Sequence, residues 1–274
     1  MKPKLEISVL CEDQVMMGFK DRIFKGAHGL SLFIRAEQNI LFDTGPSDVF
    51  LDNAALLGLD LDALEWIALS HGHWDHADGL AFLAGQIKKT KLIAHPAVFT
   101  DRHKPTGEFN GMSLSREALE ASFDLELSEG PRQLTPTVYF LGQVPRSNGF
   151  ESVSTQFYQL VNGKQAPDFL EDDTALAVKT DQGCVVIAGC AHAGICNICE
   201  HAKAVTGQDR IHMVMGGFHL LGSEDQLSRT VEYFKAHPVD RLLPMHCTGF
   251  DALCRFHREL GAEKIATGQT ICIA

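Results

Sequence analysis

Residues 70–76 restrict the fold and chemistry of this chain more than any other part of its sequence. They read Ser-His-Gly-His-Trp-Asp-His and directly follow an apolar run, residues 66–69, which predicts a short buried strand. Imidazole and carboxylate groups at this density bind zinc, iron or manganese. We therefore expect a metal site where this strand ends. Its candidate ligands are His71, His73, Asp75 and His76.

The spacing of these residues divides them into two pairs. His71 and His73 lie two residues apart at a strand end, so their side chains point to one side and can share one ion. Asp75 and His76 follow after the chain turns, which lets them face a second ion beside the first. Gly72 allows the backbone to turn tightly between the two histidines.

Strand and helix patterns alternate along the rest of the chain. We expect strands at residues 5–10, 29–34, 39–42, 66–69, 91–94, 138–141, 175–179, 184–188, 212–215 and 241–244. We expect helices at 48–57 (capped by Ser47), at 79–83, after Gly194 and at 225–235. Because no linker or close repeat interrupts this pattern, we expect one α/β domain over residues 1–274, with irregular insertions near 101–123 and 147–172.

Composition narrows the classes of partner. The chain has 274 residues and a net charge of −11, and an acidic surface repels phosphate backbones, so we expect no nucleic-acid partner. No stretch approaches the roughly 20 apolar residues of a membrane span, and the first residues lack the pattern of a secretory signal. We therefore expect a cytoplasmic protein without a membrane partner. Its eight cysteines suit reduced thiols better than a disulfide framework.

The run His-x-His-x-Asp-His resembles the second motif of the metallo-β-lactamase superfamily. Asp43, in Leu-Phe-Asp-Thr-Gly at 41–45, resembles the first motif, whose aspartate usually supports the metal-binding loop through hydrogen bonds. Further segments resemble one subfamily, the dihydropterin-6-methyl-aminobenzene-ribofuranosyl 5′-phosphate synthases and related metal-dependent hydrolases. These segments read Ala-His-Gly-Leu-Ser (27–31), Gly-Gln-Val-Pro-Arg (142–146), Gly-Cys-Ala-His-Ala-Gly (189–194), Gly-Gly-Phe-His-Leu (216–220) and Pro-Met-His-Cys-Thr-Gly (244–249).

This resemblance covers nearly the whole chain and implies a fold. That fold is a four-layer αβ/βα sandwich of two mixed β-sheets flanked by helices, with the metal site at one edge. The resemblance also implies that His246 binds the second ion and that His192 is a ligand or a catalytic group. Asp75 would be catalytic as well, because a carboxylate there can orient the attacking water. The cofactor would be two divalent ions, with zinc expected first and manganese or iron as alternatives.

Two positions depart from the superfamily pattern. Where an aspartate usually bridges two metals, this chain has Cys190, which is either a thiolate ligand or a core residue. The usual histidine before the preceding strand is missing, and Asp173 near that place is a candidate oxygen ligand. The site is therefore dinuclear with unusual ligands, or it holds one ion firmly and a second one loosely.

Three further residues are candidates for contact with substrate. They are His219, which follows a predicted strand, His28, and Arg146, whose planar guanidinium suits a phosphate or carboxylate. Cys196 and Cys199 form a single Cys-x-x-Cys pair in a predicted helix, and we expect them to pack in the core.

The ligands and the resemblance predict a metal-dependent hydrolase that uses a metal-bound hydroxide on an ester, lactone or phosphate bond. Its substrate would be a small molecule, and an anionic one is compatible with the metal. One alternative is a transferase that condenses a dihydropterin pyrophosphate with an aminobenzene ribose phosphate. Others are a metal-containing binding module without catalysis and an enzyme of iron-dependent oxygen chemistry. The sequence does not predict the oligomeric state.

Overall fold

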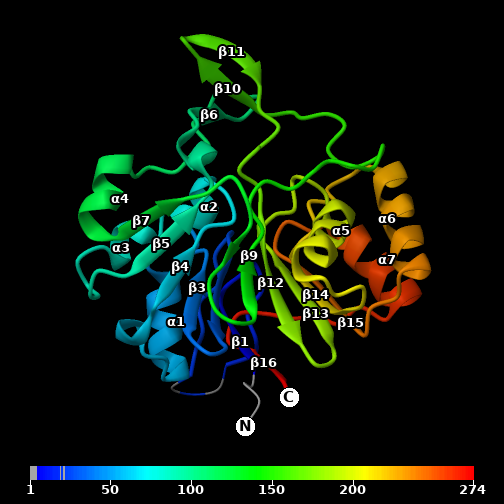
Figure 1. Cartoon of the computed structure of the whole chain (residues 1–274), viewed down its shortest axis with the longest axis horizontal. Helices are drawn as coiled ribbons and strands as arrows, with labels where there is room; N and C mark the ends of the chain where they lie inside the picture. Colours follow the sequence, from blue (N-terminus) through cyan, green and yellow to red (C-terminus); the bar gives the residue numbers. More distant parts are fainter. Residues whose placement is uncertain (1–4, 19, 21) are drawn as a thin grey trace.

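The computed structural model describes residues 5–18, 20 and 22–274, and two large β-sheets form its centre (Figure 1). The first sheet has seven strands. In spatial order they are β16 (Thr270–Ile273), β1 (Leu5–Cys11), β2 (Ser31–Arg35), β3 (Asn39–Phe42), β4 (Trp66–Ala68), β5 (Lys91–Ala94) and β7 (Asp124–Leu127). Pairing is antiparallel from β16 to β3 and parallel from β3 to β7, so this sheet is mixed.

The second sheet has six strands and is also mixed. In spatial order they are β15 (Arg241–Met245), β14 (Ile211–Gly217), β13 (Gly183–Ala188), β12 (Ala175–Thr180), β9 (Val138–Phe140) and β8 (Arg132–Gln133). The strands β13, β14 and β15 are parallel to one another, whereas the other pairings are antiparallel.

The inner faces of the two sheets pack against each other. Phe42 and Ile93 of the first sheet share one buried cluster with Ile187 and Met215 of the second. Strand β13 is buried along its whole length because alternate residues face this cluster and the helices outside. A strand covered on both faces carries a continuous apolar run, which is why residues 184–188 show so little alternation.

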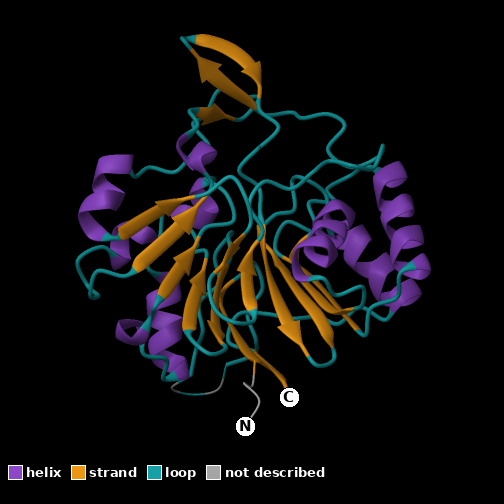
Figure 2. Ribbon diagram, in the orientation of Figure 1, coloured by secondary structure: helices purple, strands orange, loops and turns teal. Residues whose placement is uncertain are grey.

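Helices cover both outer faces, as the colouring by secondary structure shows (Figure 2). Those on the first sheet are α1 (Val49–Leu57), α2 (Trp74–Ala77), α3 (Leu80–Leu83) and α4 (Arg116–Ser122), with 3-10 turns at Leu61–Ala63 and Pro96–Phe99. Those on the second sheet are α5 (Ile195–Thr206), α6 (Glu224–Ala236) and α7 (Phe250–Leu260). The four-layer αβ/βα sandwich implied by the sequence resemblance is confirmed.

The expectation that residues 147–172 are irregular was wrong for residues 158–167, whereas the rest of this range contains no helix or strand. Strands β10 (Tyr158–Val161) and β11 (Lys164–Pro167) form a hairpin, and β10 also pairs with β6 (Arg102–His103) from the other expected insertion. We call these three strands the flap sheet, which lies at the end of the molecule away from both termini (Figure 1). Its turn is Asn162-Gly163, with both residues at positive φ, a strong hairpin signal that our reading of the sequence missed.

Other boundaries also differ from the prediction. Helix α1 begins at Val49 with Asp48 in the cap position, so Ser47 is not the N-cap. The elements β7, α7 and β16 were not predicted, since β7 and β16 are short and α7 buries only Ala252 and Phe256. Among the residues that the structure describes, none of the helices has the length and apolar character needed to cross a membrane.

Candidate metal centre

The expected ligands gather where strands of both sheets end. Asp43 and residues 70–76 directly follow β3 and β4, which are parallel neighbours in the first sheet. His192, His219 and His246 follow β13, β14 and β15, the parallel part of the second sheet. Because parallel strands bring their carboxyl ends to one edge, each sheet delivers several side chains to the same place.

Four residues at these strand ends adopt a left-handed backbone conformation that non-glycine residues rarely take. They are Asp43 (φ 56°), Ala191 (φ 50°), His219 (φ 49°) and His246 (φ 46°). Such conformations cost roughly 1–3 kcal/mol each and persist only where the surrounding structure holds them, which is common at functional sites. The fold therefore accepts strain at the point where the donor side chains meet.

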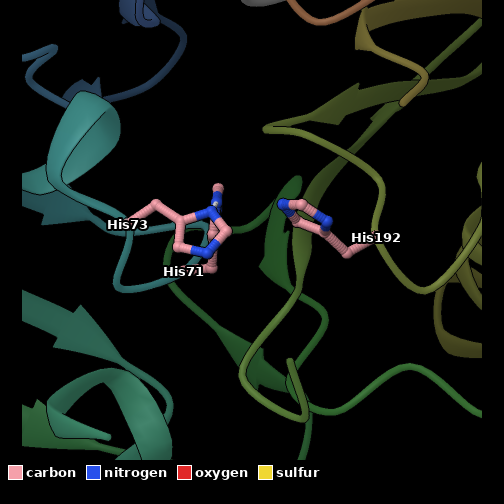
Figure 3. Close-up of side chains that lie close together, drawn as sticks. All are labelled: His71, His73 and His192. Carbon is pink, nitrogen blue, oxygen red and sulfur yellow. Dashed lines mark hydrogen bonds between the residues drawn. The ribbon is translucent and has the colours of Figure 1, made fainter. Parts of the chain in front are cut away.

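His71, His73 and His192 form what we call the first donor group. One ring nitrogen from each lies within 4.8 Å of the others, and His71 Nε2 is 3.0 Å from His73 Nδ1. Figure 3 shows the rings of His71 and His73, from the loop after β4, facing the ring of His192, which comes from the loop after β13. The Nε2 atoms of His73 and His192 are buried and have no hydrogen-bond partner. Buried nitrogens of this kind are costly unless a ligand satisfies them.

Asp75, His76 and His246 form the second donor group. Asp75 Oδ2 lies 3.4 Å from His246 Nε2 and 3.8 Å from His76 Nε2. The two Nε2 atoms of His76 and His246 are 3.2 Å apart. Unlike the first group, this one contains a carboxylate, so it offers an ion a negative charge.

Hydrogen bonds behind the rings decide which nitrogens face the cluster. Ser70 Oγ donates to Asp43 Oδ2 (2.6 Å) and accepts from His71 Nδ1 (2.9 Å). His76 Nδ1 donates to the same Asp43 oxygen (2.7 Å). The Nε2 atoms of both histidines therefore carry free lone pairs directed into the site. A carboxylate behind a ligating imidazole is the usual device for fixing its tautomer and orientation.

Asp13 plays the same part for His246 and was missed in the sequence. His246 Nδ1 lies 2.8 Å from Asp13 Oδ1, and His28 Nδ1 lies 3.0 Å from the other oxygen, Asp13 Oδ2. His28 Nε2 is in turn 3.6 Å from Asp75 Oδ2, although the His28 side chain is 60% exposed. No local pattern marks Asp13, because only the tertiary fold brings it to a residue more than 200 positions away.

The thiol of Cys190 lies inside this cluster. Its Sγ is 3.0 Å from His76 Nε2 and joins His71 and His76 in a third set of close donor atoms. Cys190 therefore lies beside one histidine of each donor group, at the position where the superfamily usually has a bridging aspartate. Cys247 and His219 form a further set with Cys190.

The geometry of these donors fits divalent metal ions. Tetrahedral zinc with bonds of about 2.1 Å holds its ligand atoms about 3.4 Å apart. The distance of 3.0 Å between His71 Nε2 and His73 Nδ1, and the distances of 3.2, 3.4 and 3.8 Å within the second group, are close to this value. Two imidazole lone pairs 3.2 Å apart, as on His76 and His246, repel each other unless a proton or a cation lies between them. The first group would hold one ion through His71, His73 and His192. The second would hold another through Asp75, His76 and His246.

Burial and charge set the protonation of the two groups differently. Burial lowers the pKa of His71, His73 and His192 well below the usual histidine value, so these rings are neutral at neutral pH. Burial also opposes a charge on His246, but its hydrogen bonds to Asp13 and Asp75 outweigh burial and raise its pKa well above that value. Burial would raise the pKa of the Asp75 carboxyl, yet His76 and His246 beside it lower that pKa below its usual range.

A buried arginine fixes the metal loop to the flap sheet. Arg102 of β6 pairs with Asp172 (3.0 Å) and Asp168 (3.3 Å), and Asp172 accepts a hydrogen bond from the Gly72 N–H (2.7 Å). Gly72 has no room for a side chain, since a Cβ there would lie 2.1 Å from the Val98 carbonyl oxygen. The loop that carries His71 and His73 is thus stabilised by ion pairs and a hydrogen bond that sequence patterns did not reveal.

The remaining candidates have different surroundings from those expected. Asp173 accepts a hydrogen bond from the Ala193 N–H (2.9 Å) and joins none of the donor sets among the described residues. Burial raises its pKa to about 7. The guanidinium of Arg146, expected to face an anionic substrate, donates instead to Ser152 Oγ and to the carbonyls of Phe169 and Leu170. Both residues therefore stabilise loops beside the site.

Aromatic rings line the first donor group. The ring of His219 lies 4.2 Å from that of His192, and its Nδ1 is buried without a hydrogen-bond partner. Phe157, beside the flap sheet, contacts His73 (5.3 Å between centroids) and His192 (5.9 Å). In contrast, Cys196 and Cys199 pack in the apolar cluster under α5, away from these donors.

Known proteins resemble this chain over most of its length. The sequence pattern of the metallo-β-lactamase superfamily matches residues 26–151. An uncharacterized protein of Methanocaldococcus jannaschii is 35% identical over 85% of this chain and 88% of its own length. The 7,8-dihydropterin-6-methyl-4-(β-D-ribofuranosyl)-aminobenzene-5′-phosphate synthase of the same organism is 31% identical, covering 97% of this chain and 96% of its own.

A solved structure agrees with these sequence matches. Tm1679, described as a metal-dependent hydrolase of the β-lactamase superfamily, superposes with a TM-score of 0.86 and is 32% identical. The match covers 98% of this chain and 99% of Tm1679. Sequence and fold agree over almost the entire length, and the chain belongs to the metallo-β-lactamase superfamily.

Proposed function

We propose that this protein is a metal-dependent hydrolase that binds two divalent cations, zinc in the first place, in its two donor groups. The observation that carries the proposal is the pair of adjacent donor sets, in which Ser70, Asp43 and Asp13 already hold the outer nitrogens of His71, His76 and His246. The donor residues come from the ends of strands in both sheets, and the two sheets share one inner core. We therefore also propose that residues 1–274 work as one domain.

Ions of this kind lower the pKa of a coordinated water towards about 7 and polarise a carbonyl or phosphoryl oxygen when they are bound. Asp75 is ionised at neutral pH, so its carboxylate can accept a hydrogen bond from a water and orient it. His192 of the first donor group comes from the opposite sheet to His71 and His73, so it can hold the other side of the reacting centre. Ester, lactone and phosphate bonds are the substrates that such an arrangement serves.

The substrate is proposed to be a small anionic molecule. His28 stands at the exposed side of the second donor group, and its hydrogen bond to Asp13 raises its pKa, which favours a positive ring there. Lys104 Nζ lies 6.0 Å from the centre of the Trp74 ring, next to the metal loop. Positive groups at this rim attract an anion despite the acidic composition of the whole chain.

A second candidate function is a transferase. It is favoured by the full-length similarity to the dihydropterin synthase at 31% identity. In that case the cations would hold a leaving pyrophosphate, and an aminobenzene ribose phosphate would take the place of water.

The free thiols of all eight cysteines suit a reducing compartment, and we propose a cytoplasmic location for either activity.

The test begins with the metal content of protein purified without oxygen and reconstituted with zinc, manganese or iron. We expect two ions per chain, and turnover on phosphoesters or lactones with incorporation of labelled oxygen from water. Formation of a condensed pterin product without label would favour the transferase. Metal binding with no turnover on either panel would favour a binding module, and a single iron with oxygen uptake would favour oxygen chemistry.

A further inference from the structure

We propose that Cys190 and Cys247 are a site of reversible oxidation, at which peroxide converts the two thiols into a disulfide and removes the Cys190 sulfur from the donor cluster. The cross-link itself follows from the geometry of the two side chains. Its effect on metal binding rests on the proposed function.

The two cysteines approach each other across the middle strand of a parallel set. Cys190 follows β13 and Cys247 follows β15, while β14 runs between these strands. At the end of β14 stands Gly217, and a Cβ there would lie 2.4 Å from Cys247 Sγ and 3.4 Å from the Cys190 Cα. The missing side chain is therefore what lets the thiol of Cys247 reach across β14 to Cys190.

The contacts of the two thiols agree with this arrangement. The Sγ atoms lie within 4.8 Å of each other, and Cys247 Sγ is 3.6 Å from the Cys190 carbonyl oxygen. A disulfide needs its sulfurs at about 2.05 Å, so closure requires a short movement of side chains that already face each other. Both residues are buried, at 3% and 7% exposure, and no disulfide joins them in this structure.

The other close pair of cysteines in the sequence serves as an internal comparison. Cys196 and Cys199 lie three residues apart on α5, and their thiols pack in the core. They are as buried as Cys190 and Cys247, but no donor set among the described residues includes them. An oxidant that enters the metal centre therefore meets Cys190 and Cys247 and not the α5 pair.

The chemistry balances with one peroxide molecule for each cross-link. One thiol loses its proton and attacks the peroxide as a thiolate, the O–O bond breaks, and a sulfenic acid forms; the hydroxide that leaves takes up the thiol's proton and becomes one water. The second thiol displaces the hydroxyl of that sulfenic acid, which releases another water and forms the S–S bond. Two electrons pass from the two sulfurs to the peroxide, and a small thiol reductant reverses the reaction.

Formation of the disulfide would remove one candidate ligand of the cations, the Cys190 thiolate. Cys190 Sγ touches His76 Nε2 and sits between the two donor groups. A disulfide sulfur carries no negative charge and is a poor ligand for zinc, which binds the thiolate. Oxidation should therefore weaken metal binding, and bound metal should in turn slow the oxidation by holding Cys190 as a thiolate ligand.

The experiment treats zinc-loaded and metal-free protein with hydrogen peroxide. We expect an intact mass lower by two hydrogen atoms, a Cys190–Cys247 peptide after digestion without reductant, and zinc release to a chromogenic chelator. Cross-linking should be faster in the metal-free protein, and dithiothreitol should restore the mass and zinc binding. Cys247→Ser should abolish the cross-link and reduce zinc release, whereas the matched core variant Cys196→Ser should behave as wild type.

Several results would overturn the proposal. These are single-cysteine sulfinic acids without a cross-link, a cross-link only at Cys196–Cys199, or zinc release unchanged in Cys247→Ser. If Cys247→Ser fails to fold, Cys247→Ala and peptide mapping of the wild-type protein answer the same question. Reduced protein that binds no metal would contradict the proposed function, while the mass and the peptide would still report on the cross-link.

Discussion

The two donor groups are built from similar residues but are held in different ways. In the first, three imidazoles lie close together, and the buried Nε2 atoms of two of them have no hydrogen-bond partner. In the second, a carboxylate joins two imidazoles, and each imidazole is backed by a further carboxylate, Asp43 or Asp13. The first group is therefore an uncharged pocket, and the second is a charged network in which protons and cations compete.

This difference shows how neighbouring donor groups of one fold would give the two proposed ions separate properties. Burial alone keeps the first three rings neutral, so their nitrogens are free for metal over a wide pH range. The raised pKa of His246 means that an ion entering the second group has to displace a proton. In the proposed site, the same ligand type would thus give one position where metal binding depends little on pH beside another where it depends strongly on pH.

Removing one ligand from each group should have the largest effect. We expect His73→Ala and His246→Ala each to lower the metal content from two ions to one and to abolish turnover. Each ion would have three donor residues, and two would not hold it. Elemental analysis of the purified variants measures this. His237→Ala, which removes a ring that bonds to the Tyr233 carbonyl and stacks on the Tyr233 ring outside the site, is the control. Unchanged metal content in both site variants would exclude these groups as the binding site.

Removing the charge behind a ligand should have an intermediate effect. Asp43→Asn weakens the support of His76 and of Ser70, and we expect metal affinity to fall about 10- to 100-fold. Competition with a chelator of known affinity measures the change. Asp240→Asn breaks a similar carboxylate–histidine pair with His212 outside the site and should leave affinity unaltered. Equal affinities in the two variants would mean that Asp43 does not orient a ligand.

Acidification should remove the ions from the two donor groups at different pH values. Because the pKa of His246 is raised, protons compete for the second group already near neutral pH, and this group should lose its ion first as the pH falls. The first group should keep its ion until the pH is well below 6.5, because the pKa values of its histidines are lowered. Metal retention after dialysis at a series of pH values checks this order.

Asp13→Asn tests the same difference in pH dependence between the two donor groups. It removes a partner that raises the pKa of His246, so the loss of the second ion should move to lower pH even though its affinity at high pH falls. Simultaneous loss of both ions at one pH, in the wild-type protein and in this variant, would contradict the difference between the groups.

The smallest effect is expected outside both groups. Cys196→Ala removes a buried sulfur from the core under α5 and should cost about 1 kcal/mol of unfolding free energy. Metal content should not change, since this thiol lies in none of the donor sets of the described chain. Thermal unfolding and elemental analysis of one preparation measure both. A loss of metal in this variant would give the Cys-x-x-Cys pair a role that its packing does not indicate.

Local patterns in the sequence were sufficient for the metal loop and most strands. His71, His73, Asp75 and His76 are close in sequence, so their grouping depends only on one strand and the turn after it. The hairpin of the flap sheet could also have been predicted from Asn162-Gly163, but its strands are partly exposed and lack a clear alternation of apolar residues. The turn signal carried information there that hydrophobic periodicity did not.

The sequence by itself determined the alternation of elements, the metal loop and, through resemblance, the family. Only the tertiary structure decided the surroundings of Cys190, Asp173 and Arg146, and it alone revealed Asp13 as the partner of His246. The physical reason is that hydrogen bonding and ligand geometry depend on distances between atoms from separate strands. Those distances are set when two sheets pack through a shared core, and no short stretch of sequence contains them.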